Sequence, residues 1–256
     1  MEDVRVLRAV LSCVPGALAL GVLVLCAVTV RPEGAHRTAA VPTRQAAARD
    51  APHFATRPRI VPRATWLAGT ETYHRDPVTY ADRVEAVFLH HTDTPNRYDC
   101  ADTPRIIRTL YAGQAGTKEW DDIGYNFLVD RCGTVYEGRA GGVDRAVVGA
   151  HTQGFNRNTA GIAAIGTFTD GTPVPPAMTE AIAALAAWKL GPGGIDPRGH
   201  VRLVSSNSLS RYKAGTSAEF FAIAGHRDGY ETFCPGQALM SLLPSIRARA
   251  AELQGR

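Results

Sequence analysis

The sequence predicts a single α/β domain in which helices flank a central mixed β-sheet. Two observations lead to this fold class. Short apolar segments of strand length are interspersed with segments whose apolar residues recur at helical spacing. One pair of short segments is also joined by a glycine-containing turn, which is typical of a β-hairpin. The chain of 256 residues is long enough for one sizeable domain and further segments outside it.

The first element is a strand over residues 84–91, VEAVFLHH, whose apolar run indicates that it is mostly buried. A helix is expected to begin at Asp102 or Thr103, because both residue types cap helices and the following Pro104 is tolerated in a first turn. Helical apolar spacing then continues through four residues: Ile106, Ile107, Leu110 and Tyr111.

Residues 125–131 and 134–139 form the predicted hairpin, with its turn at Cys132 and Gly133. Residues 161–168, GIAAIGTF, are expected to form a short apolar strand.

The last third of the chain also alternates between predicted helices and strands. A helix is expected from Pro175 and Pro176 to Leu190, where Gly191 and Pro192 end it. Residues 218–226, AEFFAIAGH, indicate one buried strand. Residues 236–252 indicate a final helix with a kink at Pro244. Residues 191–217, rich in Gly, Ser and Pro, give no assignment.

The chain before this domain has a different composition. Residues 1–30 combine two early arginines with an apolar run, which predicts either a cleaved signal peptide or a retained membrane anchor. Residues 31–57 have no apolar period and are expected to be a disordered basic linker, which leaves residues 58–256 as the folded domain. We therefore expect a protein that is secreted to the cell wall or anchored to the outer face of the cytoplasmic membrane.

The net charge of +4 has its origin in the linker, because residues 31–63 contain seven arginines and only two acidic residues. Such a segment suits an anionic surface such as a membrane or cell wall. It gives the domain no basis for nucleic-acid recognition, and we expect membrane contact only through the N-terminal segment.

The five cysteines fit an exported protein. Cys13 and Cys26 lie in the leader. In an oxidising compartment Cys100 and Cys132 are expected to form a disulfide, the alternative being two free thiols. Cys234 is left without a partner, and metal ligation is one role for it.

Two segments carry candidate metal ligands: VFLHHT, residues 87–92, and GHRDGYETFC, residues 225–234. His90 and His91 are adjacent on a strand and point to opposite faces, so at most one of them binds a given metal. The other segment offers His226 and Cys234. Three such ligands are typical of a catalytic zinc, which keeps its fourth position for water. The alternative is that the strand histidines are ordinary hydrogen-bonded residues.

Four segments, in this order, resemble the peptidoglycan recognition proteins and the related zinc-dependent N-acetylmuramoyl-L-alanine amidases: VFLHHT, DDIGYNFLVDRCGTVYEGR, VGAHTQGFNRNTAGIAAIGTF and GHRDGYETFCPG. The resemblance covers about residues 58–252. It implies a central sheet flanked by helices, with Zn²⁺ at the floor of a peptidoglycan-binding groove.

The resemblance also implies individual roles. The first histidine of HHT is the ligand in that family, which selects His90, together with His226 and Cys234, as the zinc ligands. Tyr125 corresponds to a tyrosine that assists at the zinc; from its residue type alone it is a packing residue of a strand. Thr232 is the second candidate catalytic residue, at a position where related phage enzymes have a lysine.

Four further residues are candidate substrate contacts: His91, His151, Arg139 and Asn156. Arg139 suits a stem-peptide carboxylate, or is a solvated hairpin residue. His151 contacts substrate or fixes a loop, and Asn156 stabilises a turn in the simplest alternative. Asp228 and Glu231 are expected to be loop-surface residues or residues that support the metal ligands. Asp228 could hydrogen-bond a ligand histidine. Trp66 and Trp120 line the groove or fill the core.

The function expected from these observations is hydrolysis, by a monomeric enzyme, of the amide between the muramyl lactyl group and L-alanine of peptidoglycan. The first alternative is a recognition protein that binds peptidoglycan without cutting it. In this family loss of the cysteine ligand commonly accompanies loss of activity, and Cys234 is present. A zinc peptidase acting inside the stem peptide and a structural zinc domain are further alternatives, and the latter requires a fourth protein ligand.

Overall fold

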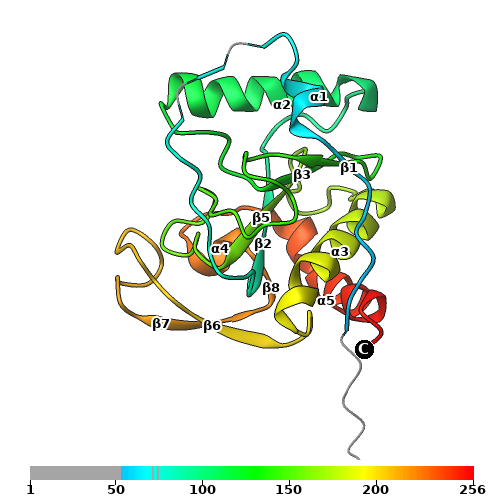
Figure 1. Cartoon of the computed structure of the whole chain (residues 1–256). Coiled ribbons are helices and arrows are strands. Elements are labelled where there is room, and N and C mark those ends of the chain that lie inside the picture. Colours follow the sequence, from blue (N-terminus) through cyan, green and yellow to red (C-terminus); the bar gives the residue numbers. More distant parts are fainter. Residues whose placement is uncertain (1–52, 71, 74) are drawn as a thin grey trace, which may run out of the picture. The chain divides into compact units, whose positions relative to one another are not determined.

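The computed structural model describes residues 53–70, 72–73 and 75–256, so the leader expected over residues 1–30 and most of the expected linker lie outside the described residues. The centre of the fold is a six-stranded mixed sheet in the order β1-β4-β3-β5-β2-β8 (Figure 1). Its strands are β1 (Ile60–Val61), β2 (Ala86–His91), β3 (Phe127–Val129), β4 (Val135–Glu137), β5 (Thr159–Ala164) and β8 (Ile223–Gly225). The predicted mixed α/β fold is therefore confirmed.

Every neighbouring pair in this sheet is parallel except β3 and β4, which form the predicted antiparallel hairpin. The helices are α1 (Arg63–Leu67), α2 (Thr103–Tyr111), α3 (Pro176–Leu190), α4 (His226–Gly229) and α5 (Gln237–Leu253). Three further helical segments are η1 (Cys100–Asp102), η2 (Ala112–Thr117), which has π geometry, and η3 (Gly191–Gly193).

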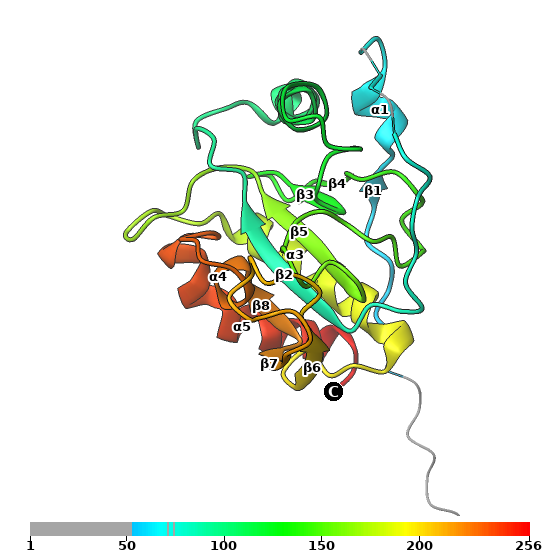
Figure 2. The same ribbon diagram turned by 90° about the vertical axis from the view of Figure 1, so that its left-hand side faces the viewer.

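The two faces of the sheet pack against different helices (Figure 2). One face, including Leu89 of β2 and Ile162 of β5, buries its side chains against α3 and α5. The opposite face, including Leu128 of β3 and Ala163 of β5, packs against α1 and α2. Because β5 is buried on both faces, its side chains are small or apolar throughout, as expected of a central parallel strand.

A two-stranded antiparallel hairpin, β6 (His200–Val204) and β7 (Ser217–Phe221), covers the outer part of the second face. Its Phe220 packs edge-on against Phe88 of β2, with ring centroids 5.4 Å apart. Residues 191–217, which the sequence left unassigned, thus contain a strand.

The single strand expected over residues 218–226 is wrong, because the structure divides it between two sheets at Ala222. The backbone N–H of Ala222 donates to Gly199 near the hairpin, while its carbonyl accepts from Val87 of β2. The burial pattern changes at the same point, from alternating along β7 to continuous along β8. An edge hairpin and a central strand therefore follow one another without a loop.

The other elements differ from expectation mainly at their ends. Helices α2 and α3 have the expected bounds, and α5 continues through Pro244, where a kink stays a prediction. Strand β5 begins at Thr159 and ends at Ala164, and Gly166 beyond it has a φ of 140° that favours glycine. No helix in the described part of the chain has the length and apolar character needed to cross a bilayer.

The first described residues already contact the domain, although composition placed residues 31–57 in the linker. Nδ1 of His53 lies 3.2 Å from the carbonyl oxygen of Gln254, and Arg57 forms an ion pair of 3.2 Å with Asp144. Residues 53 and 57, which composition places in the linker, therefore contact the folded part of the chain.

The predicted disulfide between Cys100 and Cys132 is confirmed, and it joins the start of α2 to the hairpin turn across a sequence separation of 32 residues. We expect the double substitution Cys100→Ala and Cys132→Ala to lower the free energy of unfolding by about 3 kcal/mol, because the unfolded chain gains the freedom of a long loop. Urea denaturation of the oxidised protein measures this. Reduced wild-type protein is the control and should lose a similar amount; equal stability of the oxidised protein and the double variant would contradict the prediction.

Candidate metal centre

His90 lies at the carboxyl end of β2, between β5 and β8, on the face opposite α3 and α5. Open α/β sheets bind ligands at the carboxyl ends of their strands. The alternation along β2 places Ala86, Phe88 and His90 on this face, while Val87 and Leu89 face the helices. His90 is 1% exposed. Its position at a strand end therefore places a buried imidazole next to the loops that follow the strands.

His226 lies beside His90 because of strand register. Leu89 of β2 pairs with Gly225 of β8, and each of these residues is followed by a histidine. The rings of these two histidines, His90 and His226, have centroids 4.3 Å apart. The other side of His226 stacks on Tyr230, at 5.5 Å and an interplanar angle of 12°. Tyr230 thus limits how far this imidazole can turn.

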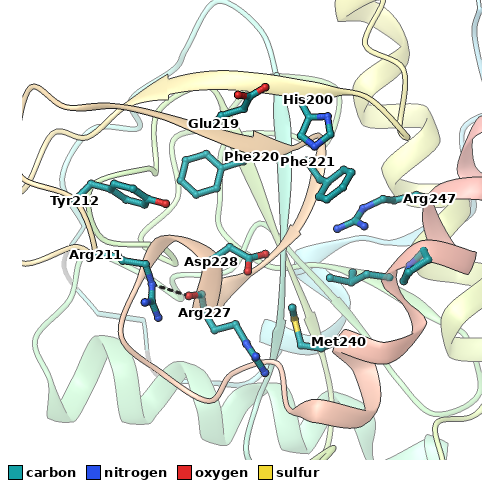
Figure 3. A pocket seen from close by; sticks show the side chains of 12 residues that line it. His200, Arg211, Tyr212, Glu219, Phe220, Phe221, Arg227, Asp228, Met240 and Arg247 are labelled. Atoms are coloured by element: carbon teal, nitrogen blue, oxygen red, sulfur yellow. Dashed lines mark hydrogen bonds between the residues drawn. The ribbon is translucent and has the colours of Figure 1, made fainter.

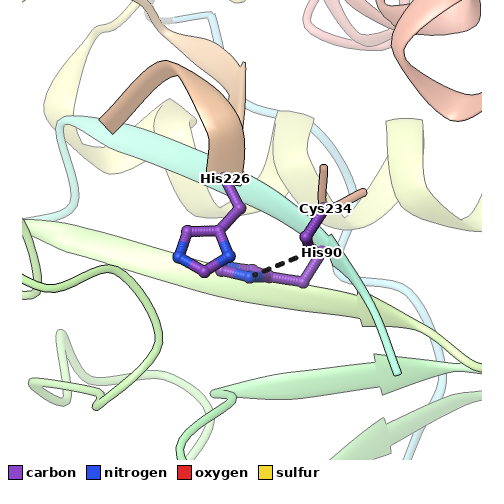
Figure 4. Close-up of side chains that lie close together, drawn as sticks. All are labelled: His90, His226 and Cys234. Atoms are coloured by element: carbon purple, nitrogen blue, oxygen red, sulfur yellow. Dashed lines mark hydrogen bonds between the residues drawn. The ribbon is translucent and has the colours of Figure 1, made fainter. Parts of the chain in front are cut away.

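Cys234 completes the group from the loop that follows α4 (Figure 4). Its carbonyl accepts a 2.9 Å hydrogen bond from the backbone N–H of Arg227, which brings the end of the loop back to its start. The Cys234 Sγ lies 3.7 Å from Nδ1 of His90 and accepts a hydrogen bond from the backbone N–H of His91. The two adjacent histidines thus have different roles: the ring of His90 is a candidate ligand, and the backbone N–H of His91 hydrogen-bonds Sγ of Cys234.

These three residues fit a zinc ion. One ligand atom of each lies within 4.8 Å of the others. Zinc–nitrogen bonds of about 2.0 Å and zinc–sulfur bonds of about 2.3 Å at tetrahedral angles require N···S separations of about 3.5 Å, close to the 3.7 Å observed between His90 and Cys234. Two imidazoles and a thiolate are typical zinc ligands. Among the described residues the group contains three members, which suits a zinc that keeps one open position.

The other group of potential ligands does not fit a metal. It consists of Cys100, Asp130 and Cys132. Its two cysteines are joined to each other in the disulfide, so neither can supply a thiolate.

Burial makes protonation of the metal-centre side chains unfavourable. It lowers the pKa of His226 to about 4, and it holds the pKa of His90 well below the usual value of 6.5. Burial also raises the pKa of the Cys234 thiol to about 12 in the absence of a cation. Both imidazoles are therefore neutral, as metal ligation requires, whereas the thiol must lose its proton when a metal binds.

We expect the chelator-treated protein to lose stability as the pH falls from 6.5 toward 4. The folded-state pKa of His226 lies below its unfolded value, so the stabilisation is fully present above pH 6.5 and is lost as the unfolded state takes up protons. The slope is at most about 1.4 kcal/mol per pH unit for each extra proton bound. Urea titrations at several pH values measure it, with His226→Asn as the comparison. A wild-type slope no steeper than that of the variant would contradict the prediction.

Tyr125 lies just before β3 and faces His90, with ring centroids 5.3 Å apart. The side chain of Gln114, from η2, is close enough to the phenol to influence its pKa, and Oε1 of Gln114 accepts from the backbone N–H of Gly124 at 2.9 Å. Burial, followed by the proximity of Cys234, raises the pKa of the phenol above its usual value of 10. Tyr125 therefore keeps its proton at neutral pH and can donate a hydrogen bond.

An open cavity of about 890 Å³ is lined by residues next to the metal ligands in sequence, among them His91, Arg227 and Phe233, but not by the ligands themselves. Thr232 lines it, and its hydroxyl oxygen accepts a hydrogen bond of 3.2 Å from the backbone N–H of Cys234. His91 lines the same cavity, and its buried Nδ1 has no hydrogen-bond partner. Phe233 also lines it and is 91% exposed. Thr232 and His91, two predicted site residues, thus line one cavity together with Phe233, an exposed aromatic residue that the sequence analysis did not single out.

A second cavity of about 600 Å³ lies between the β6–β7 hairpin, α4 and α5 (Figure 3). Arg247 crosses it, stacks on the ring of Phe221 at 3.7 Å and donates from Nε to the carbonyl of Ile223. Arg211 and Arg227 line both cavities, so the two adjoin.

The remaining predicted substrate contacts have partners within the protein. His151 is 6% exposed and its Nδ1 lies 3.2 Å from Nε2 of His90. Oδ1 of Asn156 accepts 2.8 Å hydrogen bonds from the backbone N–H groups of His151 and Thr152, which is the turn-stabilising alternative. Arg139 pairs with Asp121 at 3.3 Å and lines a separate cavity of about 290 Å³. The solvated-hairpin reading of Arg139 does not hold, because its side chain is 15% exposed.

The supporting role considered for Asp228 is not observed. Its Oδ2 accepts from the backbone N–H of Gly225 at 2.8 Å and caps α4, because the carboxylate is three residues from the helix start. Glu231 is a surface residue paired with Arg211 at 2.9 Å. Trp66 is fully buried in the core, and Trp120 is 39% exposed.

Sequence reasoning missed the polar residues that support the ligands: Gln114, Thr152, Thr159 and Tyr230. Thr152 and Thr159 hydrogen-bond the ring of His151. Thr152 and Tyr230 carried a signal, because Thr152 follows His151 directly and Tyr230 lies between His226 and Cys234, whereas Gln114 and Thr159 reach the site through tertiary structure.

Comparisons with known proteins identify relatives of this chain. Residues 80–237 match the protein family described as N-acetylmuramoyl-L-alanine amidase. A pig protein named N-acetylmuramoyl-L-alanine amidase is 33% identical over 188 residues, which cover 73% of this chain and only 27% of the pig protein. This chain thus spans about a quarter of the length of that relative.

Solved structures show the same fold. Drosophila PGRP-LB is 26% identical with a TM-score of 0.55, over 73% of this chain and 93% of that one. Peptidoglycan recognition protein LE, in complex with tracheal cytotoxin, a monomeric diaminopimelic acid-type peptidoglycan, is 27% identical with a TM-score of 0.56, over 73% of this chain and 92% of that one.

Proposed function

Because the chain belongs to the N-acetylmuramoyl-L-alanine amidase family, we propose that it is a zinc-dependent amidase that hydrolyses the amide between the muramyl lactyl group and L-alanine of peptidoglycan. The observation that supports this most strongly is the convergence of His90, His226 and Cys234, with Tyr125 facing them. Secretion or anchoring through residues 1–30, and action as a monomer, belong to the same proposal.

Each side chain has a task in this reaction. His90, His226 and Cys234 hold zinc, which when bound activates a water molecule and polarises the amide carbonyl. Tyr125 donates a hydrogen bond to the oxygen that gains negative charge, because its phenol stays protonated in its buried position. Thr232 holds the loop through its hydrogen bond with Cys234 and lines the cavity of about 890 Å³.

Peptidoglycan is proposed to occupy the cavity beside the ligands. One structural neighbour is a complex with a peptidoglycan fragment, which supports this assignment. His91 and Phe233 line the cavity and are available to a sugar or peptide group. Arg139 is a proposed contact of the stem peptide, in the separate cavity it lines with Arg75 and Asp122.

The test is hydrolysis of purified peptidoglycan by the full-length protein, with zinc, and after chelation. New L-alanine amino termini on released peptides, with intact muramyl glycan and restoration by added zinc, are the expected result. Binding of the metal-loaded protein without new termini would replace the amidase by a recognition protein. New termini inside the stem peptide would identify a peptidase instead.

Phe233 gives a separate prediction about substrate binding. Because its side chain is 91% exposed, Phe233→Ala should change the free energy of unfolding by no more than about 0.5 kcal/mol. Loss of an aromatic contact should weaken peptidoglycan binding roughly fivefold, or about 1 kcal/mol. Pull-down isotherms with insoluble peptidoglycan measure this. The control is Leu209→Ala, an exposed apolar residue that does not line the cavity; equal binding by both variants would remove Phe233 from the contact surface.

A further inference from the structure

We propose that His151 is a positioning residue that fixes the orientation and tautomer of His90, so that Nδ1 of His90 presents its lone pair to the metal. This role replaces the substrate contact expected from the sequence. It builds on the metal centre of the proposed function, but its tests do not require hydrolysis.

A continuous buried hydrogen-bond path supports the proposal. Nε2 of His90, on the side of the ring away from Cys234, lies 3.2 Å from Nδ1 of His151. Nε2 of His151 lies 3.5 Å from Oγ1 of Thr159. The Thr159 hydroxyl in turn lies 2.6 Å from the carbonyl oxygen of Phe155. The path therefore runs from a metal ligand to a backbone carbonyl.

The carbonyl oxygen of Phe155, at the end of the path, determines which atom is the donor in each hydrogen bond of the path. A carbonyl oxygen only accepts, so the Thr159 hydroxyl must donate to Phe155 and use its own oxygen as an acceptor. Nε2 of His151 then carries the proton that it donates to Thr159. In a neutral imidazole this leaves Nδ1 of His151 without a proton, so it is an acceptor for Nε2–H of His90 at 3.2 Å, beside the Thr152 hydroxyl at 3.1 Å.

Because Nε2 of His90 carries the proton of this neutral ring, Nδ1 of His90 is unprotonated and has a free lone pair. That atom lies 3.7 Å from Sγ of Cys234, on the side where the three ligand atoms converge. Metal-binding histidines generally donate their other N–H to a group that fixes the ring, and here a second histidine supplies the acceptor. Thr152 is the other candidate acceptor, but its Oγ1 is farther from Nε2 of His90, at 3.4 Å.

The surrounding backbone leaves room for the His151 ring and for little else. A Cβ atom added to Gly161 of β5 would lie 2.4 Å from Cγ of His151, and one added to Gly149 would lie 2.5 Å from its Cδ2. The backbone N–H of Gly161 is held by Oδ1 of Asn126 at 2.8 Å, so the strand cannot move away easily. The imidazole of His151 thus fits the space that Gly161 and Gly149 leave beside His90.

The first experiment uses the unmodified full-length protein, both zinc-loaded and metal-free. Nitrogen-15 NMR of the imidazole rings reports which nitrogen carries the proton. We expect His151 to be protonated at Nε2 only, and His90 at Nε2 with Nδ1 free or metal-bound. A proton on Nδ1 of His151 would overturn the proposal. A wild-type protein that binds no zinc would refute the proposed function, while the tautomers of the metal-free protein still decide this one.

The second experiment measures zinc affinity by competition with a chromophoric chelator. His151→Leu removes the acceptor and should weaken zinc binding by about 10–100-fold. His151→Asn, whose amide oxygen branches from the same position as Nδ1, should restore affinity to within about threefold of wild type, whereas a purely space-filling role would favour leucine. Leu209→Ala, an exposed residue outside the ligand group, is the control and should bind zinc as wild type does. Equal affinity of a folded His151→Leu variant and wild type would overturn the proposal even if peptidoglycan is cleaved.

Discussion

Substitution of Cys234 by alanine is expected to abolish zinc retention and amidase activity together while the fold persists. Sγ of Cys234 is the one thiol among the three candidate ligand residues, and it lies 3.7 Å from Nδ1 of His90. Removal of a direct ligand should weaken zinc binding by more than the ~10–100-fold typical of losing a supporting residue. The fold should persist because the residue is small, and its loss costs about 1 kcal/mol in unfolding free energy.

The measurements are zinc content after dialysis, release of L-alanine amino termini, and a thermal unfolding curve of the metal-free protein. Cys234→Ser is the matched control, because it preserves side-chain size but replaces the thiolate with a much poorer ligand. Both variants should be folded and inactive. Stoichiometric zinc in the alanine variant would show that Cys234 is not a ligand.

Substitution of Tyr125 by phenylalanine should separate catalysis from metal binding. The ring remains against His90, but the phenolic hydroxyl is lost. If the phenol stabilises the developing oxyanion, kcat should fall by about 10²–10³-fold. Zinc affinity should be unchanged, because the phenol is not part of the ligand group.

Steady-state hydrolysis of a soluble muramyl peptide, with zinc content measured on the same samples, provides the test. Tyr230→Phe is the control, since this tyrosine contacts His226 through its ring face and should retain near-wild-type kcat. A Tyr125→Phe variant with full activity would assign Tyr125 to packing alone. A rise in KM at unchanged kcat would assign it to substrate binding.

The parts of the fold that sequence predicts well are those whose information is local. Proline and glycine at the ends of α3, and the helical spacing of α2, are signals within a few residues. The division between β7 and β8 is not local, because it depends on which sheet each half joins. Strand β6 carries no apolar run, since only Leu203 of its five residues is buried, and its assignment depends on pairing with β7.

The candidate site shows the same limit. Residue types and the resemblance to a family singled out His90, His226 and Cys234, and the structure brings them together. The position of His151 was not predictable in the same way. Its burial behind His90 depends on a glycine of β5, and a strand glycine indicates only that something approaches closely.

The register of β2 and β8 has a consequence for the thermodynamics of metal capture. His90 and His226 are held as neighbours by backbone pairing that exists whether or not an ion is present, so their approach is part of the free energy of folding. Only the thiol belongs to a loop, and bonds within that loop already bring it back toward its start. Little conformational entropy remains to be lost when zinc arrives. Binding heats and heat capacities should therefore reflect thiol deprotonation and ion desolvation, with almost no contribution from ordering of the chain.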